Sequence, residues 1–213
     1  MERLKALACA LALCGSGMAM AESEFAIYSG GQTTPHSTVT PPTGSSFFTS
    51  WATHPLKMPI YAGWRYTNWL DDQWGVALNY THAKAYANLD ESPGYDVLEF
   101  TDGANPLTVM AMRRFEPLES GLKPYVGAGV GISFPHVEEL KTGRPATSKT
   151  FGYQYGGPVV TAAAGFKYPI SDKWDLMTEF QIHYLMLDVR VEGGRLKTNL
   201  ITNAVNIGAV YRF

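Results

Sequence analysis

Apolar and more polar positions alternate along most of the chain, and its last ten residues, AVNIGAVYRF, show the pattern clearly. Steps of two back from Phe213 reach Tyr211, Ala209, Ile207 and Val205, whereas the intervening positions include Arg and Asn. A period of two is typical of a β-strand with one face in an apolar medium. A soluble sheet and a membrane barrel both provide such a medium, so the rest of the chain has to decide.

The same alternation recurs in earlier segments. In YVGAGVGISF, residues 125–134, Val, Ala, Ile and Phe at the even positions oppose Tyr, Gly and Ser at the odd positions. In WDLMTEFQIHYLM, residues 174–186, the odd positions carry Asp, Glu, Gln and His. The pattern predicts eight strands, at residues 24–33, 58–69, 74–86, 105–116, 123–137, 157–168, 174–189 and 198–213.

The predicted connections alternate in length. Short turns fall at 70–73, 117–122 and 169–173, whereas the links at 34–57, 87–104 and 138–156 are long. Short periplasmic turns and longer outer loops are the layout of an outer-membrane barrel. We therefore predict an all-β fold, an eight-stranded antiparallel up-and-down transmembrane β-barrel, in the outer membrane of a Gram-negative bacterium.

Aromatic residues support this topology, because six of them fall at the predicted periplasmic ends of strands, where an interfacial girdle belongs. They are Trp69, Trp74, Tyr168, Trp174, Tyr211 and Phe213. The terminal Phe, with Tyr two residues before it, resembles the signal that barrels present to the barrel assembly machinery, which we expect as a partner. A soluble secreted sandwich is the alternative, but it would have shorter strands and more frequent turns.

The first 21 residues have the pattern of a secretory signal peptide. Arg3 and Lys5 precede an apolar run, and the Ala19-Met20-Ala21 segment offers a small-x-small cleavage site. We predict a signal peptide at 1–21 and a barrel domain at 22–213. Both cysteines lie in the first segment, so the mature chain has no thiol for catalysis or metal binding. Its 15 basic and 18 acidic residues give no support to nucleic-acid binding.

Eight strands enclose a lumen just wide enough to be filled by side chains. The polar residues with inward parity are Arg65, Arg114, Lys167, Glu179, Gln181, His183, Asn206 and Arg212. Buried charges have to be paired, so we expect an ion-pair network that fills the lumen, with structural rather than catalytic roles. A water-filled diffusion channel is not expected.

The candidate chemistry lies at the extracellular rim. His82 and Lys84 continue the outward register of the third predicted strand, and His136 and Glu138 continue that of the fifth. One strand separates the two, which places the histidines roughly 10 Å apart. Imidazoles and carboxylates over that span can hold a divalent cation, so we predict a metal site of His82, His136 and Glu138. The metal is not identified, and a hydrated rim that contacts lipopolysaccharide phosphates is the alternative.

Further residues at the same predicted end are candidates for substrate binding. They are Lys84, Glu99, Asp102, Tyr153 and Asn199. Glu99 and Asp102 are expected to enter between the two histidines. His36 has inward parity and cannot be placed. A serine hydrolase is disfavoured, because Ser133 and His136 are three residues apart on one predicted strand and would face opposite sides.

Four segments resemble the outer-membrane lipid A oxidases of rhizobia: THAKAYA (81–87), LEFTDGANPLT (98–108), PYVGAGVGISFPHVE (124–138) and TNLITNAVNIGAVYRF (198–213). The resemblance implies oxygen-dependent conversion of the proximal glucosamine of lipid A to 2-aminogluconate, with release of hydrogen peroxide and stimulation by divalent cations. Lipid A or lipopolysaccharide is then the expected partner and molecular oxygen the co-substrate. The resemblance assigns no catalytic residue.

A non-enzymatic alternative stays open, because fold alone does not confer function. Opacity-type surface proteins are structural or adhesive barrels that need only exposed loops. The long segment at 34–57, with Phe47, Phe48 and Trp51, suits a lipid or a protein partner equally well. We expect a monomer under either interpretation.

Overall fold

The computed structural model describes residues 22–213, so the predicted signal peptide at 1–21 lies outside the described residues. The strands are β1 (Ser23–Thr40), β2 (Phe47–Ala52), β3 (Ala62–Trp69), β4 (Trp74–His82), β5 (Ala85–Ala87), β6 (Tyr95–Phe100), β7 (Pro106–Arg114), β8 (Lys123–Ser133), β9 (His136–Lys141), β10 (Thr150–Tyr153), β11 (Gly157–Pro169), β12 (Trp174–Val191) and β13 (Gly194–Arg212). Two short 3₁₀ helices, η1 (Leu89–Glu91) and η2 (Ala146–Ser148), lie between strands. Among the described residues, no helix is long and apolar enough to cross a membrane.

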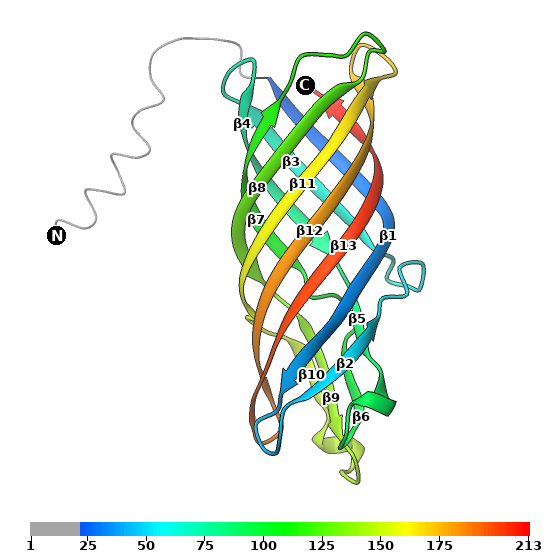
Figure 1. Cartoon of the computed structure of the whole chain (residues 1–213), viewed down its shortest axis with the longest axis vertical. Coiled ribbons are helices and arrows are strands. Elements are labelled where there is room, and N and C mark those ends of the chain that lie inside the picture. Colours follow the sequence, from blue (N-terminus) through cyan, green and yellow to red (C-terminus); the bar gives the residue numbers. More distant parts are fainter. Residues whose placement is uncertain (1–21) are drawn as a thin grey trace, which may run out of the picture.

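Eight strands close into the predicted antiparallel barrel, in the order β1, β3, β4, β7, β8, β11, β12 and β13 (Figure 1). Closure is complete because β1 pairs with β3 along one edge and with β13 along the other. Each of the eight predicted segments overlaps one of these strands, although β1, β11, β12 and β13 extend beyond the predicted bounds. Both ends of the described chain lie at the end with the short turns, which is the periplasmic end.

The side chains of β8 alternate between the outer wall and the lumen. On β8, Val126 and Val130 are exposed on the outer wall, whereas Tyr125 is buried in the lumen. Gly127 also faces the lumen, where an added Cβ would lie 2.4 Å from the sulfur of Met112. The glycine therefore leaves space for a long methionine from the neighbouring strand β7.

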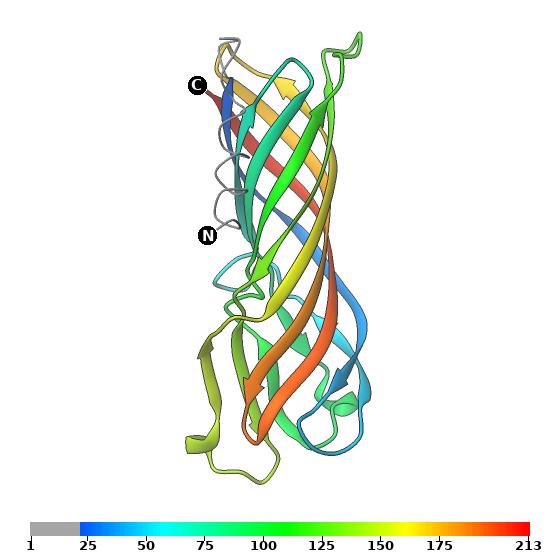
Figure 2. The same cartoon turned by 90° about the vertical axis from the view of Figure 1, so that its left-hand side faces the viewer.

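The sequence pattern predicted the three long links as loops, but each contains a strand: β2 lies in 34–57, β6 in 87–104 and β10 in 138–156. The sheet continues from the extracellular half of β1 through five short strands, in the order β1-β2-β5-β6-β9-β10. We call these five strands the extracellular extension (Figure 2). Strands of three to six residues with shifted register carry too few alternating positions for the pattern to predict them.

The two segments predicted as single long strands at 74–86 and 123–137 are each interrupted. The first divides into β4 and β5 after His82, and the second divides into β8 and β9 at Phe134-Pro135. Proline removes a backbone donor and breaks the pairing pattern at the second break. Each break marks the point where the chain leaves the barrel and enters the extension.

An apolar core closes the extracellular end. Leu185, Leu187 and Val189 of β12 are buried in one cluster with Leu98 and Phe100 of the extension. The extension and the extracellular part of β12 therefore share one apolar core.

The periplasmic girdle is confirmed with one correction. Trp74, Tyr168 and Trp174 are exposed on the outer wall, and Phe213 is exposed beside them. Trp69 is instead buried inside the barrel, because odd-numbered positions of β3 face the lumen. Its indole ring packs against the guanidinium of Arg114 at 4.4 Å.

Candidate functional site

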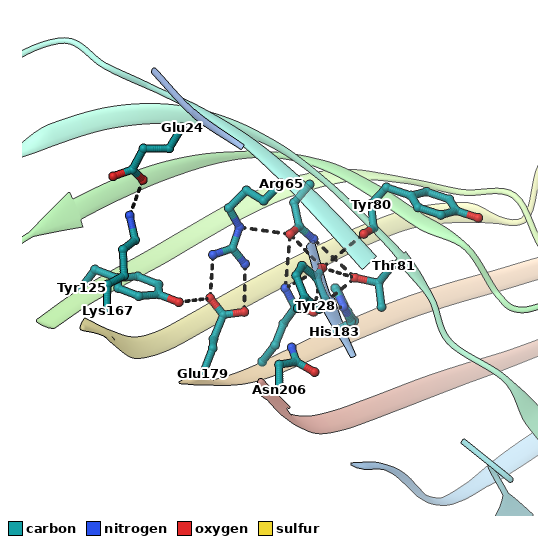
Figure 3. A network of polar contacts seen from close by, with 12 residues as sticks. Glu24, Tyr28, Arg65, Tyr80, Thr81, Tyr125, Lys167, Glu179, His183 and Asn206 are labelled. Atoms are coloured by element: carbon teal, nitrogen blue, oxygen red, sulfur yellow. Dashed lines mark hydrogen bonds and ion pairs between the residues drawn. The ribbon is translucent and has the colours of Figure 1, made fainter. Parts of the chain in front are cut away.

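A polar network fills the middle of the lumen (Figure 3). Arg65 of β3 and Glu179 of β12 form a buried bidentate pair, with N–O distances of 2.6 and 2.9 Å. Tyr125 donates to the same carboxylate at 2.9 Å, and Arg65 Nε donates to Asn79 Oδ1 at 3.1 Å. The predicted ion-pair network is confirmed, and it joins strands on opposite sides of the barrel.

A second layer of the network lies toward the extracellular side. The Tyr28 hydroxyl lies 2.8 Å from the Thr81 hydroxyl, which donates to Gln181 Oε1 at 3.2 Å. His183 Nε2 lies 3.0 Å from Gln181 Oε1, and His183 Nδ1 lies 2.7 Å from the Thr161 hydroxyl. Both ring nitrogens are thus engaged in the packed interior, which is consistent with a structural histidine.

The remaining inward residues lie where parity predicted. Asn206 accepts from the Tyr61 hydroxyl at 3.0 Å. At the periplasmic mouth, Lys167 pairs with Glu24, Arg212 with Asp175 at 3.2 Å, and Arg114 with Glu22 at 2.5 Å. Because these side chains fill the lumen, it is unsuited to serve as a water-filled diffusion channel.

The outer face of the extension gathers four of the eight candidate site residues. Glu99 on β6 lies directly opposite Glu138 on β9, and on its other side it lies opposite Tyr86 on β5. On β10, Tyr153 lies opposite His136. These five residues define what we call the rim face, and all five come from segments predicted to lie at the extracellular end.

The carboxylates of Glu99 and Glu138 repel each other across the strand pair. Glu138 accepts from the Thr101 hydroxyl and from the Lys149 ammonium at 2.5 Å. Burial raises the pKa of Glu138, but these two donors outweigh it and hold that pKa below its usual value. Glu99 forms no ion pair with any of residues 22–213, and burial together with the Glu138 carboxylate raises its pKa.

The two candidate histidines lie on either side of the chain at Gly103. The His136 backbone N–H donates to the Gly103 carbonyl at 3.0 Å, and a Cβ added to Gly103 would lie 2.8 Å from His82 Nδ1. His82 Nδ1 lies 3.1 Å from Asn105 Oδ1. Two ring nitrogens of these histidines, His82 Nε2 and His136 Nδ1, are buried and make no hydrogen bond within residues 22–213.

The three predicted metal ligands do not form a ligand set in this arrangement. His136 Nδ1 lies 3.6 Å from a Glu138 oxygen, but that carboxylate is engaged by Lys149, and the Gly103 chain separates His82 from the pair. Within residues 22–213, no group of three or more His, Asp or Glu side chains is placed to hold a metal ion. The residues present therefore do not fit a resident cation, and no chemical step is derived through one.

Lys84 is buried, rather than turned outward as the register predicted. Its ammonium donates to the backbone carbonyl of Lys57, in the segment 54–61 that connects β2 to β3. Burial, followed by repulsion from Lys57, lowers the pKa of Lys84. Neither lysine forms an ion pair within 4.0 Å with any of residues 22–213, and the Asp102 carboxylate offsets the lowering of the Lys84 pKa only in part.

Tyr153 and Asp102 belong to the same region, because burial and then the Asp102 carboxylate raise the pKa of Tyr153. Asn199 does not, since it is exposed on β13 and the sheet order separates β13 from β6 by β1, β2 and β5. His36 faces outward, against its predicted parity, because the register of β1 shifts between Thr34 and Ser37.

Sequence reasoning missed the cations and aromatic rings that surround the carboxylates. Lys149 pairs with Glu138, and Lys57 lies over the Tyr86 ring at 5.2 Å. Phe151 contacts His136 edge-on, with ring centres 4.6 Å apart. Lys57, Lys149 and Phe151 lie in segments predicted as loops, so no register placed them on a face. The charged residues of HVEELK, residues 136–141, were the available signal.

Residues 7–213 match the family described as outer membrane protein beta-barrel domain. Similar solved structures include Neisserial surface protein A, 14% identical with a TM-score of 0.50 over 90% of this chain and 96% of that chain. OprG from Pseudomonas aeruginosa is 16% identical with a TM-score of 0.51, over 91% and 96%. AlkL, determined in lipid bilayers, is 13% identical with a TM-score of 0.50, over 93% of each.

At these identities the structural matches show the fold alone. No curated protein matches the chain. The family match spans nearly the whole sequence and agrees with the closed eight-stranded barrel. The chain therefore belongs to the outer membrane protein beta-barrel domain family and lies in the outer membrane of a Gram-negative bacterium.

Proposed function

We propose that the chain binds the headgroup of lipid A in the outer leaflet and oxidises its proximal glucosamine to 2-aminogluconate. The observation that carries the binding is the rim face, where Glu99 and Glu138 lie among Lys149, Tyr86 and Tyr153. Carboxylates accept hydrogen bonds from sugar hydroxyls and amines, and lysines bind phosphate as point charges. The oxidation itself follows from the resemblance of the four sequence segments.

Placement supports lipid A over a soluble sugar. The rim face begins where β4 and β8 leave the barrel, so it stands at the height of lipid headgroups. The filled lumen leaves the outer wall and the rim as the surfaces at which a lipid can meet the protein. A lipid headgroup reaches such a surface by diffusion within the leaflet.

The proposed reaction balances with molecular oxygen as the oxidant. The proximal glucosamine opens to its aldehyde only where C1 carries a free hydroxyl and no phosphate. The aldehyde carbon then gains a hydroxyl from water, and two electrons and two protons pass to oxygen to give hydrogen peroxide. The sugar gains one oxygen atom, about 16 mass units, as its aldehyde becomes a carboxylate. Glu99, Glu138 and the two histidines are the groups of this chain that can hold or move the proton released.

Lipid A mass is the measurement that tests this proposal. We expect lipid A from cells that express the chain to contain the species heavier by one oxygen atom, and His82→Ala and His136→Ala each to abolish that species. His36→Ala is the matched control, because this exposed histidine stacks on Phe48 outside the rim face. Heat-modifiable gel mobility verifies that each variant has assembled.

Each outcome separates the possibilities. An identical lipid A mass with wild-type, variant or absent protein would contradict the oxidation and favour a structural or adhesive barrel. Oxidation that persists in both histidine variants would exclude the site while leaving the reaction. Chelation tests separately the divalent cation that the sequence alone predicted at His82, His136 and Glu138, which this arrangement does not fit because Lys149 engages Glu138.

A further inference from the structure

A groove of about 580 Å³ runs along the outer wall of the barrel. Its floor is made of small residues from three neighbouring strands, which are Ser29, Ala62, Gly63, Gly208 and Ala209. Its sides are formed by Phe25, Ile27, Trp64 and Tyr80, and His82 lies at its extracellular end. The wall here faces the hydrocarbon of the bilayer, so the part of a ligand that lies in this elongated groove has to be an apolar chain.

The hydroxyl groups of the groove are already satisfied toward the protein. The Ser29 hydroxyl donates to the Tyr61 carbonyl at 2.7 Å, and the Tyr80 hydroxyl donates to Asn105 Oδ1 at 3.0 Å. The Trp64 ring stacks between Phe25 and Tyr80, with ring centres 6.2 and 6.0 Å apart. The groove thus presents aromatic and aliphatic sides, and His82 Nε2, which makes no hydrogen bond within residues 22–213, lies at its extracellular end.

The segment 54–61 lies at the extracellular end of this groove and has two different faces. Leu56 and Met58 are 84% and 77% exposed, and Ile60 is also exposed. The residue between the first two, Lys57, turns toward the Tyr86 ring. Figure 1 shows the segment projecting sideways from the junction of barrel and extension, so its exposed apolar residues stand outside the barrel wall.

Charge identifies the headgroup. Lys57 and the buried Lys84 repel each other, and neither has an ion-pair partner among residues 22–213. The exposed Lys57 ammonium, with the buried Lys84 behind it and the apolar groove below, is complementary to a phosphate that carries acyl chains.

We propose that this groove holds one acyl chain of lipid A, while Lys57 and the segment 54–61 hold the phosphate of the same molecule. The proposal rests on the proposed function in taking lipid A as the occupant, but it concerns binding and not oxidation. It places the glucosamine beside His82, between the groove and the rim face.

Native mass spectrometry of the refolded mature barrel with hexa-acylated lipid A measures the binding. Ala62→Phe fills the floor of the groove, and we expect it to lower the lipid A-bound fraction about tenfold, the equivalent of losing about 1.4 kcal/mol of contact. Ala128→Phe is the matched control, because Ala128 is an exposed small residue on β8, separated from β1 by β13, β12 and β11. Ala209→Leu fills the same floor from another strand, should Ala62→Phe fail to assemble.

The charge is tested with lipid A that lacks its phosphates. We expect Lys57→Gln to weaken binding of phosphorylated lipid A about tenfold, as loss of one charge-assisted contact does, and to leave the dephosphorylated lipid unaffected. Lys173→Gln, in a periplasmic turn, is the control. Phosphatidylethanolamine provides the comparison for ordinary boundary lipid.

Equal retention of lipid A by the groove-filling variants and Ala128→Phe would overturn the proposal, as would retention of phosphatidylethanolamine as tightly as lipid A. The two hypotheses fail separately. Groove-dependent binding without the heavier lipid A would retain the groove and reject the oxidation. If Ala62→Phe and Ala209→Leu leave both the oxidation and the binding of lipid A unchanged, the groove is rejected and the oxidation is retained.

Discussion

Tyr95, at the start of β6, buries its hydroxyl without a hydrogen-bond partner within residues 22–213. Burial, followed by the Glu139 carboxylate, raises its pKa from 10.0 to about 12. An unfolded tyrosine therefore loses its proton before the folded one does. The contribution of this group to stability is complete below pH 10 and is lost as pH rises toward 12.

We predict that Tyr95→Phe leaves the extension as stable at neutral pH, or more stable by about 1 kcal/mol, because it removes a buried unpaired hydroxyl. The variant should also lose less stability than the wild type between pH 10 and 12. Urea unfolding followed at both pH values measures this, with the exposed Tyr155→Phe as control. Parallel pH curves for wild type and Tyr95→Phe would contradict the assignment.

At the scale of elements, period-two alternation was sufficient for the barrel and insufficient for the extension. Strands such as β8 have one face in the bilayer and one in the lumen, so composition alternates over eleven residues. The extension has short strands, and a bulge at Asp96 in β6 shifts the register. The site residues were located at the correct end, but their pairing depends on contacts between segments that no local pattern encodes.

A side chain closes the gap between the extension and the barrel. The β9–β10 hairpin stands beside the β12–β13 hairpin, and the Gln154 amide bridges them (Figure 2). Gln154 Nε2 donates to the Arg190 carbonyl at 3.0 Å, and Gln154 Oε1 accepts from the Arg190 N–H at 2.7 Å. The amide thus takes the place of a backbone peptide at an otherwise unpaired strand edge.

We predict that Gln154→Ala speeds hydrogen exchange at the Arg190 amide about tenfold or more, because two hydrogen bonds of about 0.5–1.5 kcal/mol each are lost. Hydrogen exchange in the periplasmic half of β12, around Glu179, should not change. Gln73→Ala, in a periplasmic turn, is the control for loss of a glutamine. Unchanged protection at Arg190 would show that the seam is held by the neighbouring Arg144–Glu192 pair instead.

The whole molecule depends on contacts that cross the lumen, since each strand otherwise bonds only to its two neighbours. Arg65 lies on β3 and Glu179 on β12, which the closed strand order separates by β1 and β13. Their side chains are almost completely buried. Parity placed both residues in the lumen, but only the structure shows that the pair is bidentate and shares its carboxylate with Tyr125.

We predict that Arg65→Met or Glu179→Gln alone lowers the free energy of unfolding by about 3–5 kcal/mol, because each leaves its partner buried and short of a counter-charge. The double variant should be less destabilised than the sum of the two, since it removes both charges together. Urea unfolding in lipid vesicles, scored by heat-modifiable gel mobility, measures the cycle. The exposed pair of Lys197 and Asp188, 3.7 Å apart, is the control and should contribute at most about 1 kcal/mol. Strictly additive losses for Arg65 and Glu179 would show that the bridge across the lumen does not stabilise the barrel.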